Sequence, residues 1–221
     1  MDEDQRHEVC QVKKAPGLYL TDWVGASTVN ESNILGVTHI FSLLSTQELE
    51  QYGPDEGDNV QLRHLDIKDH PSQDILPFLA RECDWIDSVI SHGTGGQGGV
   101  VLIHCQQGIS RSAVFIVAYL MRKYQLSYDE ALQLVKDDRP IAQPNAGFEE
   151  QLRLWEGCDY SIYVAGSIGK TKDEYNTWKR DQEEAVTPTV TSPKTPKTPI
   201  IEIGETGIID MVERKGVHEE D

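Results

Sequence analysis

The sequence predicts a single α/β domain, with a central mixed sheet flanked by helices, followed by a disordered C-terminal tail. Strand-like and helix-like patterns alternate through residues 15–157, which is typical of an α/β sheet covered by helices. Residues 100–103 (VVLI) are apolar at every position, as in a central strand buried on both faces. After Trp178 the chain is rich in Thr and Pro and poor in large apolar residues. It cannot bury enough apolar surface to offset the loss of conformational entropy on ordering, which predicts a disordered tail.

Three further segments have the character of strands. Residues 17–20 (GLYL) and 38–44 (THIFSLL) are short and rich in β-branched and aromatic residues. Residues 60–67 (VQLRHLDI) alternate apolar and polar side chains, which predicts a strand with one buried face.

Four segments have helical patterns. Ser72 is the predicted N-cap of a helix that continues to residue 90. Residues 111–124 (RSAVFIVAYLMRKY) are apolar on nearly every side and predict a buried helix. Residues 128–135 and 147–155 predict two amphipathic helices. The glycine-rich residues 93–99 (GTGGQGG) predict a connector, because they lack the pattern G-x-x-x-x-G-K-[ST] of a phosphate-binding loop.

The charge is strongly negative and excludes some partners. The net charge is −17, of which residues 1–157 carry −12, from 12 Lys and Arg against 24 Asp and Glu. This balance argues against nucleic acid as a partner and against an electrostatic membrane anchor. The longest apolar stretch, 114–121, is shorter than the roughly 20 residues of a membrane span, and the acidic start MDEDQRHEV is unlike a signal peptide.

Four cysteines, Cys10, Cys83, Cys105 and Cys158, lack C-x-x-C spacing. Their scatter argues against a structural zinc site and a disulfide framework. We therefore expect no metal, no cofactor and a reducing compartment, the cytoplasm and/or the nucleus. Whether Cys83 forms a redox pair with Cys105 is left open by the sequence.

The segment with the clearest chemistry is residues 103–112 (IHCQQGISRS), between the predicted buried strand and the predicted buried helix. A short turn there directs backbone N–H groups and the positive end of the helix dipole into one concavity, which makes an anion site. Gly108 permits the tight backbone, and Arg111 can bind two phosphate oxygens with its planar guanidinium.

Cys105 is the predicted nucleophile at the base of this anion site. The field that binds a phosphate also stabilises a thiolate, which then faces phosphorus. Ser112 is expected to donate a hydrogen bond to the sulfur; the competing interpretations are that Ser112 only caps the helix and that Cys105 is a buried structural thiol. His104 is expected to hydrogen-bond the loop backbone. The remaining loop residues are expected to bind phosphate through their backbone, with side chains outside the chemistry: Gln106, Gln107, Ile109 and Ser110.

The pattern H-C-x-x-G-x-x-R-[ST] in residues 104–112 resembles the signature of the cysteine-dependent protein tyrosine phosphatases, and HCQQGISRSA is most similar to their dual-specificity branch. Residues 17–23, 36–43, 65–75 and 139–152 resemble further family segments in the family's order. The resemblance covers about residues 15–157 and implies the protein tyrosine phosphatase fold. The surrounding sequence is similar to the subgroup that contains a Ser/Thr/Tyr-interacting pseudophosphatase, a relative that lacks the nucleophilic cysteine. Because this chain keeps Cys105, we expect it to be active.

A phosphate ester needs a general acid to protonate its leaving oxygen, and three aspartates are candidates. Asp66 is expected on the solvent face of a strand, and Asp74 in the first turn of the helix after Ser72, where a carboxylate is an ordinary stabilising charge. Asp69 is expected in the loop between them, and the family's acid aligns there as well, so Asp69 is the predicted acid.

The expected function is a protein phosphatase acting on phosphotyrosine and phosphoserine/phosphothreonine through a cysteinyl-phosphate. The variable loop positions carry no Lys or His, which disfavours polyanionic substrates such as inositol lipids. The alternatives are a phosphoprotein-binding scaffold with little turnover and a phosphatase for a non-protein ester.

The predicted organisation has four parts: an N-terminal segment (1–14), the catalytic domain (15–157), a partly helical extension (158–178) and a Thr/Pro-rich acidic tail (179–221). The tail has four motifs for proline-directed kinases, for which a plain solvated linker is the alternative: Thr187-Pro188, Ser192-Pro193, Thr195-Pro196 and Thr198-Pro199. Residues 200–203 (IIEI) and 208–211 (IIDM) resemble peptides that add a strand to a SUMO-like partner.

Overall fold

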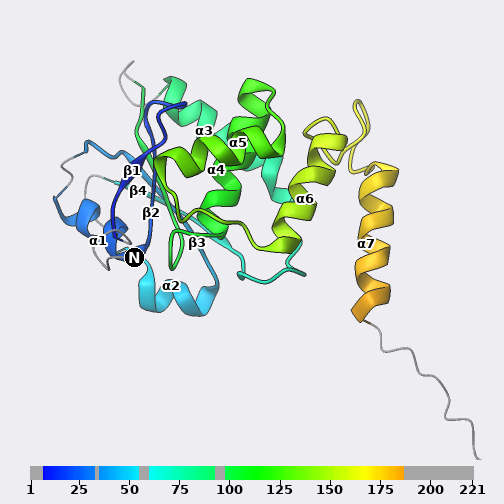
Figure 1. The fold of residues 1–221 in the computed structure, drawn as a ribbon, viewed down its shortest axis with the longest axis horizontal. Coiled ribbons are helices and arrows are strands. Elements are labelled where there is room, and N and C mark those ends of the chain that lie inside the picture. The colour runs from blue at the N-terminus through cyan, green and yellow to red at the C-terminus, as the bar shows by residue number, and fades with distance from the viewer. Residues whose placement is uncertain (1–6, 33–34, 55–59, 93–97, 187–221) are drawn as a thin grey trace, which may run out of the picture. The chain divides into compact units, whose positions relative to one another are not determined.

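The computed structural model describes residues 7–32, 35–54, 60–92 and 98–186 (Figure 1). Its elements follow in chain order: β1 (Cys10–Gln11), β2 (Leu18–Thr21), α1 (Trp23–Ser32), β3 (His39–Leu44), α2 (Thr46–Tyr52), β4 (Gln61–Asp66), α3 (Leu76–His92), β5 (Val101–His104), α4 (Arg111–Tyr124), α5 (Tyr128–Asp138), α6 (Ala146–Gly157) and α7 (Asp173–Val186). No helix in these ranges is long and apolar enough to cross a bilayer.

The five strands form one mixed sheet in the order β1-β2-β5-β3-β4. β1 is antiparallel to β2, and the other neighbours are parallel. All four residues of β5 are buried, because it lies between β2 and β3 and has helices over both faces. The predicted fold class and the predicted central strand are therefore confirmed.

The two faces of the sheet support two apolar clusters. Alternate side chains of β5, Val101 and Ile103, join the main cluster with α3, α4, α5 and α6, whereas Leu102 points to the opposite face. There it meets Ala26 and Val29 of α1 in a smaller cluster. The period-two alternation of a strand thus places a helix layer on each side of the sheet.

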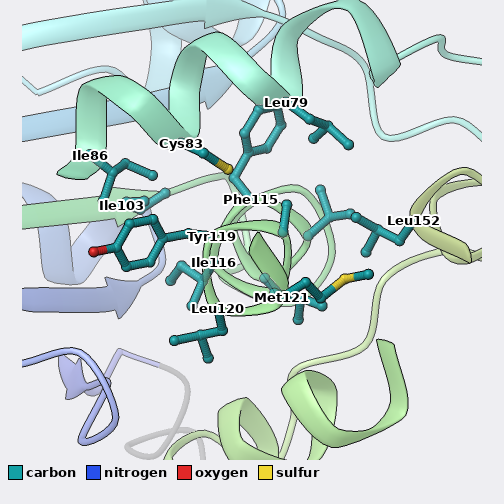
Figure 2. Packing of buried hydrophobic residues seen from close by; sticks show 14 of the residues in the cluster. Leu79, Cys83, Ile86, Ile103, Phe115, Ile116, Tyr119, Leu120, Met121 and Leu152 are labelled. Atoms are coloured by element: carbon teal, nitrogen blue, oxygen red, sulfur yellow. The ribbon is translucent and has the colours of Figure 1, made fainter. Parts of the chain in front are cut away.

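Helix α4 is the centre of the main cluster, and every residue from Arg111 to Met121 is buried. Figure 2 shows its side chains packed between two surrounding helices: Phe115 lies beside Leu79 and Cys83 of α3, and Leu152 of α6 lies on another side. The buried helix predicted at 111–124 is confirmed with these bounds. Its burial fixes the position of its first turn, where the candidate site begins.

The structure differs from the sequence predictions at one helix start, at one strand residue and in three elements that were not predicted. Ser72 does not cap α3; its hydroxyl is 2.7 Å from Nδ1 of His70, and the helix begins at Leu76, whose N–H donates to Asp74. On the edge strand β4, Leu65 is buried, but Leu62 is 40% exposed, since β4 has a neighbour on one side only. The sequence did not predict β1, α1 or α2.

The extension after residue 157 ends in α7, which carries acidic Asp173 and Glu174 in its first turn, where they complement the helix dipole. Tyr175 is buried, and Trp178 packs against the main cluster. The predicted start of the tail at residue 179 is therefore too early, because the helix continues to Val186. The rest of the predicted tail, with its kinase and SUMO-like motifs, lies outside the described residues, as does most of the glycine-rich connector.

Candidate active site

The loop between β5 and α4 surrounds the thiol of Cys105. The Cys105 side chain is almost fully buried; its Sγ accepts a hydrogen bond from the N–H of Gly108 at 3.2 Å and lies 3.2 Å from Oγ of Ser112. Both partners stabilise negative charge on sulfur. The N-cap position of α4 belongs to Ser110, so the Ser112 hydroxyl is available to the sulfur, as the catalytic interpretation of Ser112 requires.

Gly108 is required by the turn itself. Its φ of +65° lies in the left-handed region, which favours glycine. A Cβ at this position would lie 2.6 Å from the carbonyl oxygen of Thr21. The Gly108 carbonyl accepts a hydrogen bond from Nε of the buried Arg139 at 2.8 Å, so this second guanidinium supports the loop from behind.

The guanidinium of Arg111 is oriented by Glu48 of α2. Nη1 and Nη2 donate to the two carboxylate oxygens at 2.5 and 2.9 Å, and Nη1 also donates to the carbonyl of Ile67 at 3.3 Å. Glu48 is itself fixed by a capping box with Ser45. Partial burial acts to raise the pKa of Glu48, but the hydrogen bonds from Arg111 and Ser45 outweigh it and lower the pKa to about 2.

These contacts leave one edge of Arg111 for a ligand. A guanidinium has five N–H groups. The carboxylate of Glu48 and the carbonyl of Ile67 accept hydrogen bonds from both N–H groups of Nη1 and from one N–H group of Nη2. The buried Nε has no hydrogen-bond partner among the described residues. Nε and the remaining Nη2 hydrogen form the side-on fork that binds two oxygens of a phosphate. An unsatisfied buried N–H is costly, so this edge is suited to an anion.

Asp69 lies beside the free edge of Arg111. Its Oδ1 accepts hydrogen bonds from Oγ of Ser110 and Nδ2 of Asn145, both at 2.8 Å, and its Oδ2 is 4.0 Å from Nε of Arg111. The Ser110 side chain was predicted to be incidental to the chemistry; in the structure its hydroxyl donates a hydrogen bond to Asp69, the predicted acid. Asn145 also begins α6 by accepting from the N–H of Phe148, which ties the Asp69 loop to a helix end.

His104 is fully buried at the end of β5, where its Nε2 is 2.7 Å from Oγ of Ser42. Burial lowers the pKa of His104 to about 4, so the ring is neutral near pH 7. The sequence predicted that His104 hydrogen-bonds the loop backbone; its Nε2 instead contacts Ser42 of β3, and Nδ1 has no hydrogen-bond partner among the described residues.

The other two candidate acids lie in different settings. Asp66 accepts hydrogen bonds from the backbone N–H and hydroxyl of Thr46 at the start of α2. Asp74 accepts from the hydroxyl of Tyr175 at 2.7 Å. Neither lines the hollow beside Arg111, which has a volume of about 470 Å³ and these lining residues: Ser45, Gln47, Glu48, Lys68, Asp69, Gln106, Gln107 and Arg111. In the described ranges, no group of three or more His, Cys, Asp or Glu is positioned to hold a metal.

A comparison with family models decides which family this arrangement represents. The model described as the dual specificity phosphatase catalytic domain matches residues 18–158. The chain belongs to the dual-specificity phosphatase family. The predicted family membership is therefore confirmed, and the matched range contains the whole Cys105 loop together with Glu48, Asp69 and Asn145.

Relatives agree with this membership. Dual specificity protein phosphatase 1 of Arabidopsis thaliana is 41% identical over 138 residues, which are 62% of this chain and 64% of that protein. Protein phosphatase Slingshot homolog 3 of Homo sapiens is 30% identical over 212 residues, 93% of this chain but 29% of that protein. The chain thus spans less than two thirds of the length of these curated relatives.

A solved structure shares the fold. The crystal structure of the human tyrosine phosphatase-like serine/threonine/tyrosine-interacting protein matches with a TM-score of 0.63 and 32% identity, covering 69% of this chain and 98% of that one. This dual-specificity phosphatase chain therefore has the predicted protein tyrosine phosphatase-like fold.

The two cysteines whose pairing the sequence left open are both free and buried in the structure. Cys105 contacts Ser112 in the first turn of α4, whereas Cys83 belongs to α3 and lines a hollow with Arg122. The structure therefore contains no disulfide between Cys83 and Cys105.

The sequence did not single out Glu48, Asn145 or Arg139. The capping pattern of Ser45 and Glu48 is present in the sequence, but it predicts only a helix start. The contact of Glu48 with Arg111 joins residues 63 positions apart, which no local pattern reports.

We predict that Glu48→Gln lowers kcat by about tenfold or more, because a misplaced Arg111 no longer matches the transition-state oxygens. Inhibition by inorganic phosphate should weaken by a smaller factor than kcat falls, because the loss of the Glu48 charge also removes a repulsion of the bound phosphate. Steady-state kinetics with p-nitrophenyl phosphate measure both effects. Glu50→Gln, an exposed carboxylate on the same helix, is the matched control; a wild-type kcat in Glu48→Gln would contradict the positioning role.

The same variant has an expected pH signature. The lowered pKa of Glu48 means that the folded state favours its charged form, so its contribution to stability is present above the unfolded pKa near 4.3 and is lost as the pH falls toward 2. The difference in unfolding free energy between wild type and Glu48→Gln should shrink over that range in urea titrations. A difference that stays constant with pH would show that the ion pair does not stabilise the fold.

Proposed function

We propose that the chain is a dual-specificity protein phosphatase, which hydrolyses phosphotyrosine and phosphoserine/phosphothreonine in proteins through a cysteinyl-phosphate. One observation carries the proposal: the free edge of Arg111 and the carboxyl group of Asp69 line one hollow together with Gln106 and Gln107, the two residues that follow Cys105 in its loop. A nucleophile, an anion-binding fork and an acid are the parts that phosphoryl transfer needs.

In the first step, the phosphate oxygens are bound by the loop N–H groups and by Nε and Nη2 of Arg111. The Cys105 thiolate attacks phosphorus, an S–P bond forms, and the P–O bond to the substrate breaks. Protonated Asp69 gives its proton to the departing oxygen. Ser110 and Asn145 hold the Asp69 carboxyl group near that oxygen.

In the second step, the Asp69 carboxylate accepts a proton from water, whose oxygen attacks phosphorus. The S–P bond breaks, inorganic phosphate leaves, and the electron pair returns to sulfur as thiolate. The hydroxyl of Ser112 and the N–H of Gly108, each 3.2 Å from Sγ, stabilise that charge. Arg111, held by Glu48, stabilises the charge on phosphorus in both steps.

Phosphoproteins are the substrates that the charges support best. The loop side chains that line the hollow, Gln106 and Gln107, are neutral, and Lys68 is the one cation there besides Arg111 among the described lining residues. A polyanionic lipid or RNA end would meet few cations on a chain whose residues 1–157 carry a net charge of −12. A single phosphate on a peptide matches the single anion site.

A second candidate function is a phosphoprotein-binding scaffold with little turnover. Its support is similarity to the human serine/threonine/tyrosine-interacting protein, which is 34% identical over 152 residues. A phosphatase for a non-protein ester is the remaining alternative. The presence of Cys105 in the loop beside the hollow that Arg111 and Asp69 line favours the protein phosphatase.

The partner and compartment assignments are also proposals. Proline-directed kinases and SUMO-like proteins are candidate partners of the tail, on the sequence motifs alone. The cytoplasm or the nucleus is the proposed compartment, because the four cysteines are free and thiols of this kind persist in reducing compartments.

Cys105→Ser should abolish phosphate release from p-nitrophenyl phosphate and from phosphotyrosine and phosphoserine peptides, since a hydroxyl in this field is a far weaker nucleophile than a thiolate. Circular dichroism should show an unchanged fold. Cys158→Ala, a buried cysteine outside the loop, is the control and should retain turnover. Full activity in Cys105→Ser would refute the mechanism, and a wild-type chain that binds phosphopeptide without turnover would support the scaffold.

Asp69→Asn should lower kcat on a phosphoserine peptide by about 100-fold and lower it less on p-nitrophenyl phosphate. The reason is that a serine alkoxide needs a proton to leave, whereas a nitrophenolate leaves with little help. Asp74→Asn is the matched control, because Asp74 bonds to Tyr175 instead of facing the hollow. Equal losses in the two variants, or equal losses on the two substrates, would contradict the assignment of Asp69 as the acid.

A further inference from the structure

A second hollow adjoins the phosphate hollow and has no part in the mechanism above. Its volume is about 340 Å³, and Gln106 and Gln107 of the Cys105 loop line both hollows. A peptide that places its phosphate on Cys105 therefore brings neighbouring side chains to this second hollow. Its other walls come from the N-terminal segment, α1 and α2.

Two aromatic rings form one wall of the second hollow. Trp23 is the first residue of α1 and Tyr52 the last of α2, two helices that lie near each other in Figure 1. Their ring centroids are 5.3 Å apart, with an interplanar angle of 50°. Both side chains are half-buried, so the rings are anchored in the fold while part of their surface faces the hollow.

The same hollow carries a negative charge. The Asp22 side chain is 5% exposed; its Oδ1 accepts from the N–H of Gly25 at 2.9 Å, and its Oδ2 is 2.5 Å from Nδ1 of His7. Neither Lys nor Arg is among the described residues that line the hollow. The surrounding catalytic domain is acidic as well. When His7 is neutral, Asp22 is the one charged side chain among the described residues that line the hollow, so this place favours a cation and disfavours an acidic side chain.

We propose that the second hollow is a specificity site for an arginine side chain of the phosphoprotein substrate, close in sequence to the phosphorylated residue. The inference rests on the proposed function and names the flanking chemistry that this function selects. A guanidinium stacks on the faces of Trp23 and Tyr52 by cation–π contact, and the Asp22 carboxylate supplies the opposite charge. The amide oxygens of Gln106 and Gln107 accept its N–H groups.

Arginine fits this site better than other side chains. An apolar side chain would pack against the rings of Trp23 and Tyr52 but would gain nothing from the negative charge of Asp22. A lysine ammonium is more strongly hydrated and lacks the planar face that stacks on aromatic rings. A glutamate would meet the Asp22 carboxylate and the acidic domain.

The test uses the full chain and a set of phosphotyrosine peptides of one background sequence. Arg, Leu or Glu is substituted in turn at each of the three positions before and after the phosphotyrosine, and kcat/KM is measured for each peptide. We expect one position at which Arg exceeds Leu by about fivefold, the size of one partly desolvated cation–π contact, and at which Glu is the poorest of the three.

Two variants then locate the preference. Trp23→Ala should reduce the ratio of Arg to Leu to near one, while its kcat/KM on p-nitrophenyl phosphate, which has no flanking residue, stays within about twofold of wild type. Asp22→Asn keeps an oxygen that accepts from the N–H of Gly25 but removes the negative charge. It should also reduce the ratio of kcat/KM for the Arg peptide to that for the Leu peptide, and it serves as the test if Trp23→Ala does not fold. Tyr163→Ala, a remote exposed aromatic, is the matched control and should keep the ratio.

The proposal is overturned if Leu equals or exceeds Arg at every position, or if a preference for Arg survives in both Trp23→Ala and Asp22→Asn. Failure of the proposed function would look different. In that case the wild-type chain would release no phosphate from any substrate, p-nitrophenyl phosphate included.

Discussion

The sharp turn between β5 and α4 is the constraint on which the rest of the site depends. It reverses the chain within residues 105–110 and is possible because Gly108 adopts a φ of +65° against the backbone of Thr21. The turn directs the N–H of Gly108 to the Cys105 sulfur, and the burial of α4 fixes where its helix dipole ends. Strand, turn and helix together make an anion site largely from backbone groups.

Side chains from distant parts of the chain complete that site by fixing one another. Glu48 orients Arg111 from one side, and Ser110 and Asn145 hold Asp69 on the other. Arg139 supports the loop through the Gly108 carbonyl. Each functional group thus has a partner that limits its motion, which is the preorganisation that charge stabilisation in a transition state requires.

The bulk charge and the local field have opposite signs. Residues 1–157 carry a net charge of −12, yet the candidate site suits an anion because Arg111 and the loop amides act over a few ångströms, where solvent screening is weak. The negative surface affects what surrounds the phosphate. In our proposal it selects for arginine beside the phosphorylated residue, with Asp22 and the rings of Trp23 and Tyr52 as the contacts.

Local sequence patterns predicted β5, α4 and the Cys105 loop between them. They did not predict the contacts between side chains that are distant in the sequence. The all-apolar run of β5 and the all-round apolar α4 have few structural alternatives, so their positions followed from sequence. The helix α2 is short and polar, and the apolar residues of α1 follow no clear helical pattern, so local patterns did not predict these two helices, which carry Glu48 and Trp23. Serine is a common N-cap residue, but the hydroxyl of Ser72 hydrogen-bonds to His70 instead of to the helix. Residue propensities do not predict which of these two partners the hydroxyl takes.

The central claim is that Cys105 carries the phosphoryl group between the two steps. The most direct measurement is mass spectrometry of the chain after a rapid denaturing quench during turnover of a phosphotyrosine peptide. The account predicts a phosphoryl group on the peptide that contains Cys105, in a larger fraction for Ser112→Ala, because the sulfur then leaves phosphorus more slowly. Steady release of phosphate with no phosphoryl group on Cys105 in either protein would contradict it.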